Sequence, residues 1–121
     1  MLIYMPYKKN KFKAKKCQYK GMTFDSKIEL QRYIFLEDMA SIGKIKNLDR
    51  QVKYDLSVNG IKITSYKPDF VYDLPDGTLI VEDVKSPATA KLEGFRIRCK
   101  LMKAIHGIDV KTVMGGGIAT L

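Results

Sequence analysis

The turn at residues 75–77, with the sequence Pro-Asp-Gly, constrains the fold most, because it joins two segments that both have the composition of β-strands. A three-residue loop with Gly77 in the left-handed conformation pairs Leu74 with Thr78. Every other facing pair follows by counting outward from this pair, one residue back on the first strand for each residue forward on the second. A two-residue turn would shift the register by one residue and exchange the two faces of one strand. The length of this loop therefore decides which side chains of the hairpin meet.

With the three-residue loop, Asp69 lies directly opposite Asp83, and two facing carboxylates repel each other. Such a pair needs a shared proton, a neighbouring cation or a bound metal ion. Because side chains alternate along a strand, Lys85 shares a face with Asp83, whereas Glu82 is expected as a surface residue. An ion pair with Lys85 explains the acids without a metal, and a metal site is the alternative.

The rest of the chain predicts a single α/β domain in which helices flank a mixed central sheet. Ser26 is a suitable N-cap and Gly43 a suitable stop for the first helix. Asn59-Gly60 is a strong signal for a type I′ hairpin turn, and Ser86-Pro87 begins the second helix. The expected elements are a helix at 26–43, strands at 45–58, 61–73 and 78–85, a second helix to about 106, and a strand at 108–113. This order is αβββαβ. The second helix starts at residue 86 or, as the alternative, only after Gly94.

The charge of the chain is unevenly distributed. The net charge is +9, and residues 1–20 hold seven lysines and no acid. Aromatic residues alternate with these lysines, a combination that suits an arm that neutralises phosphates and stacks on bases. A solubilising tail is the alternative. We expect residues 1–20 to form a flexible basic arm and residues 21–121 to form the folded domain.

Composition excludes several classes of protein. No apolar run approaches the roughly 20 residues that cross a bilayer, and no secretory leader is predicted. Cys17 and Cys99 fit no metal-binding spacing, which predicts free thiols in a reducing cytoplasm, with a disulfide as the alternative. His106 is the only histidine, too few for an HNH-type nuclease or a zinc site. The glycine-rich segment 114–121 lacks the lysine of a phosphate-binding loop, and we interpret it as a mobile tail.

Glu29 is unusual for its place on the first helix. Its helical neighbours at the same face are apolar, so the carboxylate is expected to face the interior and not the solvent. A capping box explains this without any further role, because Ser26 and Glu29 have the required spacing and Glu29 can accept from the Ser26 amide.

The second helix carries a comparable feature. Its core stripe is apolar, and Lys100 belongs to the opposite, solvated side. Arg98 falls at the border of the apolar arc, where a guanidinium is favourable only beside an acid or a phosphate. A long side chain that extends to the rim of the helix is the alternative.

Pro68-Asp69, thirteen intervening residues and Asp83-Val84-Lys85 together resemble the signature of the PD-(D/E)XK nuclease superfamily, which has the restriction-endonuclease-like fold. The resemblance is closer to small phage-encoded nucleases and junction resolvases within it. It extends from about residue 12 to residue 113 and rests on the segments FDSKIELQRY, GKIKNLDRQVKYDL, KPDFVY, VEDVKS and FRIRCKL. One departure is Ser86-Pro87, which stands where the family pattern leads us to expect glycine.

The resemblance implies a role for each matching residue. Asp69 and Asp83 would hold Mg²⁺, for which Mn²⁺ is expected to substitute, and Glu29 would complete the metal site. Lys85 would position or activate the attacking water and offset charge on the phosphate. Basic residues that would contact DNA are Arg98 (or Lys100 in its place) and, on the arm, Lys13, Lys15 and Lys16, while Gln51 would face the site from the first strand.

The expected function is that of a Mg²⁺-dependent DNA endonuclease. No groove-reading motif accompanies the core, which favours branched DNA, such as a Holliday junction or a fork, over a sequence-specific target. Cutting two strands of a symmetric object favours a homodimer, and the compartment would be the cytoplasm of a bacterial host. The alternatives are a DNA-binding protein on the same scaffold that does not cut, and a single-strand binder that uses the basic arm.

Overall fold

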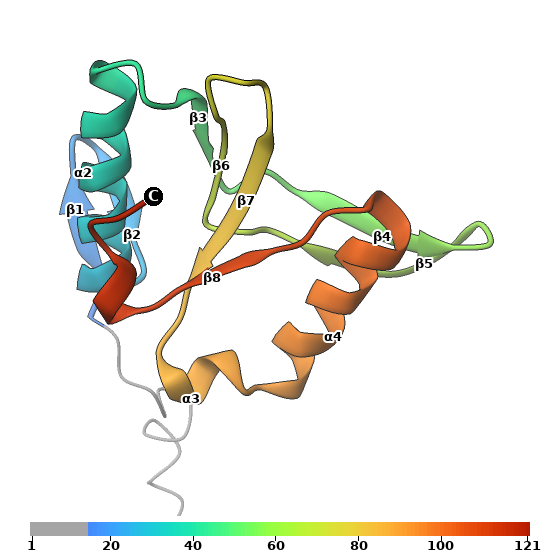
Figure 1. Ribbon diagram of the computed structural model, residues 1–121. Helices are drawn as coiled ribbons and strands as arrows, with labels where there is room; N and C mark the ends of the chain where they lie inside the picture. Colours follow the sequence, from blue (N-terminus) through green and yellow to red (C-terminus); the bar gives the residue numbers. More distant parts are fainter. Residues whose placement is uncertain (1–14) are drawn as a thin grey trace, which may run out of the picture.

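The computed structural model describes residues 15–121 and has a mixed α/β architecture (Figure 1). Its central sheet has the strand order β3-β6-β7-β8. Three of these strands run antiparallel to their neighbours, and β8 pairs with β7 in parallel. The sheet is therefore mixed, as the sequence predicts. The strands are β3 (Lys46–Arg50), β6 (Phe70–Asp73), β7 (Leu79–Val84) and β8 (Lys111–Val113).

The predicted register of the β6–β7 hairpin is confirmed. The Leu74 amide donates to the Thr78 carbonyl at 2.9 Å, and Gly77 has a φ of +92°, in the left-handed region that glycine adopts without strain. Phe70 then faces Glu82 along the ladder. Consecutive residues of β7 consequently point to opposite sides of the sheet.

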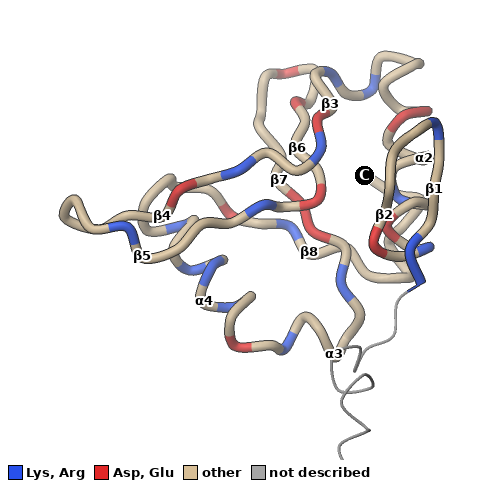
Figure 2. The backbone as a smooth tube through the Cα atoms, turned by 180° about the vertical axis from the view of Figure 1, so that it is seen from behind, with Lys and Arg blue, Asp and Glu red and all other residues tan. Residues whose placement is uncertain are grey.

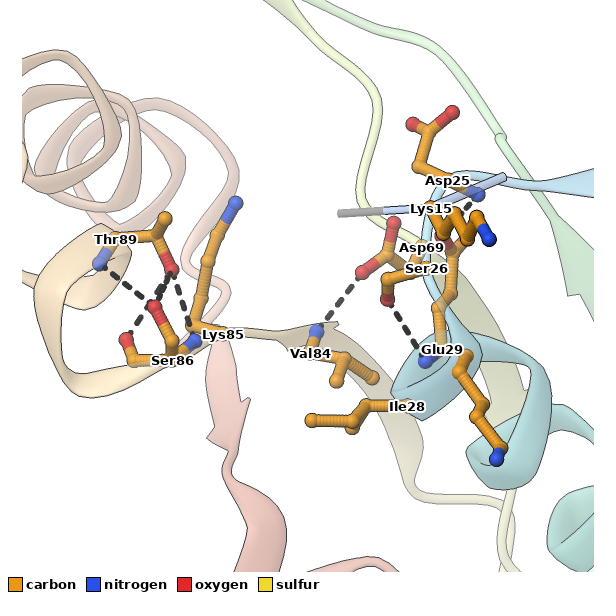
Figure 3. Close-up of a pocket in the computed structure, with 11 residues that line it drawn as sticks. Lys15, Asp25, Ser26, Ile28, Glu29, Asp69, Val84, Lys85, Ser86 and Thr89 are labelled. Carbon is orange, nitrogen blue, oxygen red and sulfur yellow. Dashed lines mark hydrogen bonds between the residues drawn. The ribbon is translucent and has the colours of Figure 1, made fainter. Parts of the chain in front are cut away.

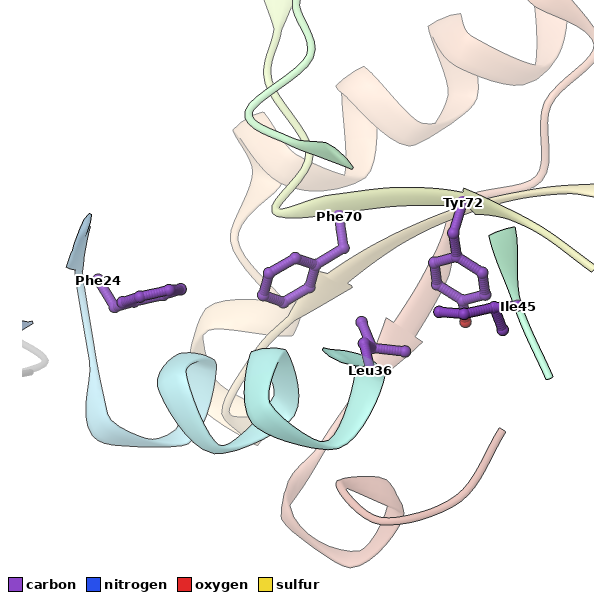
Figure 4. Packing of buried hydrophobic residues seen from close by; sticks show 5 residues of the cluster. All are labelled: Phe24, Leu36, Ile45, Phe70 and Tyr72. Atoms are coloured by element: carbon purple, nitrogen blue, oxygen red, sulfur yellow. The ribbon is translucent and has the colours of Figure 1, made fainter. Parts of the chain in front are cut away.

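Each side of the sheet has its own apolar cluster. Helix α2 (Lys27–Ser41) covers one side with a cluster of Phe24, Leu36, Ile45, Phe70 and Tyr72 (Figure 4). The cluster on the other side contains Leu56, Tyr66, Val71, Val81 and Met102. Neighbouring residues of β6, Phe70 and Val71, belong to different clusters, which is the alternation expected of a strand with two buried faces.

The two long strands predicted at 45–58 and 61–73 are wrong, because each is divided in two. Strands β4 (Tyr54–Val58) and β5 (Ile61–Tyr66) form a separate two-stranded sheet that projects from the central one (Figure 1). Gln51, with a φ of +56°, turns the chain between β3 and β4. Pro68 is fully buried between β5 and β6, where it has no amide to donate to a ladder. The predicted type I′ turn is confirmed by a positive φ at both Asn59 and Gly60.

The first helix begins and ends where the sequence predicts, with Ser26 as its N-cap. The predicted second helix is wrong as a single element, because it consists of three pieces. Ser86 caps the short helix α3 (Pro87–Ala90), which is followed by α4 (Glu93–Leu101) and a π-helical turn at Met102–His106. Gly107, in the left-handed conformation, ends the last piece. Along the chain, α2 precedes β3 and α4 lies between β7 and β8.

An N-terminal hairpin of β1 (Cys17–Tyr19) and β2 (Met22–Phe24) packs beside α2. The expected boundary of the basic arm at residue 20 falls within this hairpin. Residues 1–14, including Lys13, lie outside the described part of the chain. Cys17 and Cys99 are both free thiols, as predicted. None of the helices formed by residues 15–121 has the length and apolar content that crossing a bilayer requires.

Two further predictions are wrong for one common reason, the buried side chain of Arg32. Its guanidinium binds Glu82, which is fully buried and not a surface residue. It also donates to three main-chain carbonyls near the C-terminus, those of Gly117, Ile118 and Thr120, at 2.6–3.1 Å. The segment after β8, which includes the 3-10 turn η2 (Gly115–Gly117), is thus fixed to α2 and is not a mobile tail.

Candidate functional site

Asp69 and Asp83 meet where strands β6 and β7 come together at one end of the hairpin. Asp69 immediately precedes β6, and Asp83 is the penultimate residue of β7. The Asp69 amide donates to Oδ1 of Asp83 at 3.0 Å, and the Val84 amide donates to Oδ2 of Asp69 at 2.8 Å. Each carboxylate thus accepts a hydrogen bond from the main chain of the other strand. The pairing that the turn predicts brings both carboxylates to one place.

Asp83 has two additional partners. The Tyr66 hydroxyl donates to Oδ2 of Asp83 at 2.5 Å, and Nζ of Lys85 lies 3.7 Å from the same oxygen. Burial, followed by the charge of Asp83, raises the pKa of Tyr66 far above its usual value, so the phenol stays a donor. Nζ of Lys85 also lies 4.6 Å from the centre of the Phe95 ring. Asp83 and Lys85 share one face, as expected.

The surroundings of Asp69 disfavour the charged form of its carboxyl group. Burial raises its pKa to about 9, and the hydrogen bond to Asp83, the charge of Asp83 and the charge of Glu29 act in the same direction. Burial likewise raises the pKa of Glu29. The charge of Lys85, which lies beside Asp83, does not offset these effects at Asp69. A proton or a second cation is required at Asp69.

Glu29 caps its helix in a slightly different way from the capping box that the sequence predicts. Its amide donates to Oγ of Ser26 at 3.1 Å, as expected, but its Oε1 accepts from the amide of Asp25 at 3.0 Å and not from that of Ser26. The side chain is buried, and it lies beside Asp69 (Figure 3). The cap holds the Glu29 carboxylate near that of Asp69.

Two clefts open on either side of this acidic centre, and both are lined by Asp25, Asp69 and Lys85. The first has a volume of 430 Å³ and lies between the start of α2 and the start of α3 (Figure 3). The second has a volume of 380 Å³ and lies between the end of β5 and α4. Its wall includes Asp83, Arg98 and Gln51.

The donor set fits a divalent cation that is shared with a substrate. Within residues 15–121, no three acidic, histidine or cysteine side chains are arranged closely enough to enclose an ion by themselves. Mg²⁺, however, usually takes one or two carboxylates and completes its shell with water and substrate phosphates. Asp69 and Asp83 supply these two carboxylates, and Oδ1 of Asp69 has no hydrogen-bond donor among the described residues.

Residues 9–113 match the protein family described as "Protein of unknown function (DUF1064)". The chain belongs to the DUF1064 family. No curated protein and no solved structure matches it. The acidic residues that line the two clefts, and Lys85, all lie within the part of the chain that matches the DUF1064 family.

The structure brings only some of the predicted basic residues of this DUF1064 protein to the acids. Lys15 lines the first cleft and Arg98 the second, where its Nε donates to the Ser65 carbonyl at 3.3 Å. Lys16 instead pairs with Asp25 at 3.3 Å. Lys100 is exposed and lines neither cleft.

Four residues that matter to the site of this family member were missed by the sequence reasoning. Lys67 lines the second cleft, and its only sequence signal is its place directly before Pro68-Asp69. Tyr66 binds Asp83 from β5. A single strand that spans β5 and β6 does not predict this contact. The other two, Arg32 and Glu82, support β7 from the opposite face. Arg32 does lie four residues from both Ile28 and Leu36, a spacing that places it on a partly apolar stripe.

Proposed function

We propose that this chain is a metal-dependent DNA endonuclease that hydrolyses phosphodiester bonds. The observation that carries the proposal is the meeting of the Asp69 and Asp83 carboxylates beside Lys85 at the junction of two clefts. A basic chain with a net charge of +9 attracts a polyanion. The paired acids at its clefts supply what a cation-assisted attack on phosphate requires.

Asp69 and Asp83 are the proposed ligands of Mg²⁺, which Mn²⁺ can replace, and Glu29 adds a third carboxylate nearby. When bound, the ion stabilises the negative charge that develops on the phosphate oxygens during hydrolysis. The raised pKa of Asp69 supports the assignment, since a cation would remove the reason for that carboxyl to hold a proton.

The protein's own side chains have separate tasks in this proposal. Lys85 offers its ammonium to the phosphate from the face that holds Asp83, and it positions the attacking water. Tyr66 fixes the orientation of Asp83 through their 2.5 Å hydrogen bond. Arg98 is held by the Ser65 carbonyl, which leaves its terminal nitrogens free to contact the cut strand.

The restriction-endonuclease-like core is the fold that best accounts for these elements. Helix α2, the antiparallel strands β3, β6 and β7, helix α4 and the parallel strand β8 follow one another in the expected αβββαβ order, with the β4–β5 hairpin inserted. The acids and the lysine of the nuclease signature occupy the ends of two neighbouring strands of this sheet. This arrangement supports the assignment of Pro68-Asp69 and Asp83-Val84-Lys85 to that signature.

Branched DNA, such as a Holliday junction or a fork, is the proposed substrate. The described residues contain no helix-turn-helix or other helical groove-reading motif, which argues against a sequence-specific target. Symmetric cutting of a junction would require a homodimer. The setting would be phage recombination or replication in the cytoplasm of a bacterial host.

A cleavage assay tests this function. Labelled four-way junction, fork, linear duplex and single-stranded DNA are incubated with the protein in Mg²⁺, Mn²⁺ or EDTA, beside Asp83→Asn. We expect cutting that requires a metal ion and disappears in the variant. Tight binding without cleavage in either metal would contradict the proposal and would leave the acids as partners of Lys85.

A DNA-binding protein that does not cut is the second candidate. The contacts of Asp83 with Tyr66, Lys85 and the Asp69 amide favour it, because they satisfy this carboxylate without any metal ion. The same assay separates the two candidates, since only the nuclease turns over its substrate.

A further inference from the structure

We propose that the two clefts are phosphate-binding subsites on either side of the cut, and that one single strand of DNA crosses the site from Lys67 and Arg98 to Lys15 and Lys27. This inference rests on the proposed function and, of the two branched substrates named there, favours the fork, which presents a separated strand. It adds two residues, Lys27 and Lys67, that neither the motif nor its resemblance assigns.

The residues that line both clefts mark the middle of the proposed DNA path. Asp25, Asp69 and Lys85 line both clefts, so a chain that occupies both passes over these three residues. The volumes of 430 and 380 Å³ each lie in the range of sites that hold one small ligand. Each cleft can therefore take about one nucleotide, which suits a separated strand better than a duplex.

The residues that line only one of the two clefts mark the two ends of the proposed DNA path. Lys15 and Lys27 line only the first cleft, and Lys67 and Arg98 line only the second. Figure 2 shows the acidic positions of β7 in the middle of the chain trace, with basic positions on α4 to one side and beside the N-terminal hairpin on the other. Positive charge thus stands at both ends of a short negative centre.

These four cations are free to bind phosphate. Several other basic residues of the domain already pair with acids, among them Lys16, Lys20, Arg32, Lys62 and Lys103. In contrast, no carboxylate among residues 15–121 lies within ion-pair distance of Lys15, Lys27, Lys67 or Arg98. Residues 1–14 contain no acid that could pair with them. Unpaired cations therefore lie on both sides of the two acids. The negative phosphates of a DNA strand would pair with these cations.

The test measures binding and not cleavage. The full chain in EDTA is titrated into a fluorescein-labelled single-stranded oligonucleotide of mixed sequence, and fluorescence anisotropy gives the affinity at a series of salt concentrations. The variants are Lys27→Ala, Lys67→Ala and the double variant. Lys44→Ala is the matched control, because Lys44 is equally exposed and lines neither cleft.

We expect each cleft variant to weaken binding several-fold and to reduce the slope of log affinity against log salt by about 0.7, the value for one phosphate contact on a single strand. The double variant should lose about twice as much slope, and Lys44→Ala should lose neither slope nor affinity beyond the error of the measurement. A duplex of the same sequence should show smaller effects of both lysines.

Three results would overturn the path: slopes that do not change, a loss confined to one of the two lysines, or equal effects on duplex and single strand. Failure of the path can be distinguished from failure of the nuclease proposal. If the slopes fall but no DNA is cut, the path holds and the endonuclease fails. If DNA is cut in an Asp83-dependent way while the slopes are unchanged, the endonuclease holds and the path fails.

Discussion

The Arg32 guanidinium binds both oxygens of the Glu82 carboxylate, with Nε 2.6 Å from Oε1 and Nη2 2.9 Å from Oε2. Neither side chain is exposed to solvent. The Tyr72 hydroxyl donates to the same carboxylate at 2.7 Å. This network joins α2, β6 and β7 on the face of the sheet opposite to Asp83, and it supports the strand that carries Asp83 as its next residue.

Removing one member of this pair should destabilise the protein strongly. Arg32→Met leaves Glu82 charged and buried without its partner, and we expect a loss of about 3–5 kcal/mol in the free energy of unfolding. The combined Arg32→Met and Glu82→Leu variant removes both charges and should recover most of that loss. Urea unfolding followed by circular dichroism measures both. A single variant that is as stable as the double one would contradict this account.

Two tyrosines offer a matched comparison between structure and site. Tyr66 donates to Asp83 and Tyr72 to Glu82, so each phenylalanine variant removes one hydrogen bond to a charged group and should cost about 1.5–3 kcal/mol. Only Tyr66→Phe should also weaken the binding of Mn²⁺, by about tenfold or more, because it releases a proposed ligand. Calorimetric titration checks this. Equal metal affinities in the two variants would argue against a positioning role for Tyr66.

The stability of the metal-free protein should fall as pH rises. Burial, together with Asp83 and Glu29, raises the pKa of Asp69 to about 9 in the folded state, whereas an unfolded aspartate titrates near 3.9. Between these values the folded chain holds a proton that the unfolded chain has lost, so unfolding becomes easier with increasing pH. Asp69→Asn, which is uncharged at every pH, should lack this contribution.

Urea unfolding in EDTA between about pH 5 and pH 9 measures the effect over the window that the two pKa values define. The variant should gain stability relative to the natural protein as pH rises. Parallel curves for the two proteins would show that Asp69 titrates normally. Adding Mg²⁺ should release a proton from Asp69, which calorimetry in two buffers of different ionisation enthalpy detects.

Lys85 should matter more for cleavage than for binding. Lys85→Met keeps the length of the side chain but removes the charge that offsets the developing negative charge on phosphate, and we expect a loss of about 10²–10³-fold in the cleavage rate. Binding of single-stranded DNA should weaken by less than tenfold, because one phosphate contact among several is lost. Single-turnover cleavage and anisotropy give the two numbers. A proportional loss in both would make Lys85 a binding residue only.

The sequence predicted those parts of the fold that local geometry controls. The register of Asp69 and Asp83 follows from one short turn, and the start of α2 follows from the N-cap at Ser26. The division at Gln51 was not predictable, because a positive φ at a residue other than glycine is set by the surrounding structure and not by the residue itself.

Contacts between distant parts of the chain explain the other differences. Arg32 and Glu82 are fifty residues apart, and each reads as an ordinary charged residue until the other is placed beside it. The C-terminal segment looks mobile in the sequence because its binding groups are main-chain carbonyls, which carry no sequence signal. The hydrogen bond of Tyr66 to Asp83 depends on the break between β5 and β6. Pro68 lies at this break, but the sequence alone did not predict that the strand would divide there.

The loop at residues 75–77 sets limits on how a chain of this kind can change in length. Adding or removing one residue there would turn Asp83 toward α2 and Glu82 toward the clefts. The carboxylate that now pairs with Arg32 would then stand at the candidate site, and the carboxylate of the candidate site would be buried against α2. At Asn59-Gly60, the outer end of the β4–β5 hairpin, the same change would alter only the projecting sheet. Insertions should therefore accumulate at the second turn in related sequences, while the first keeps a constant length.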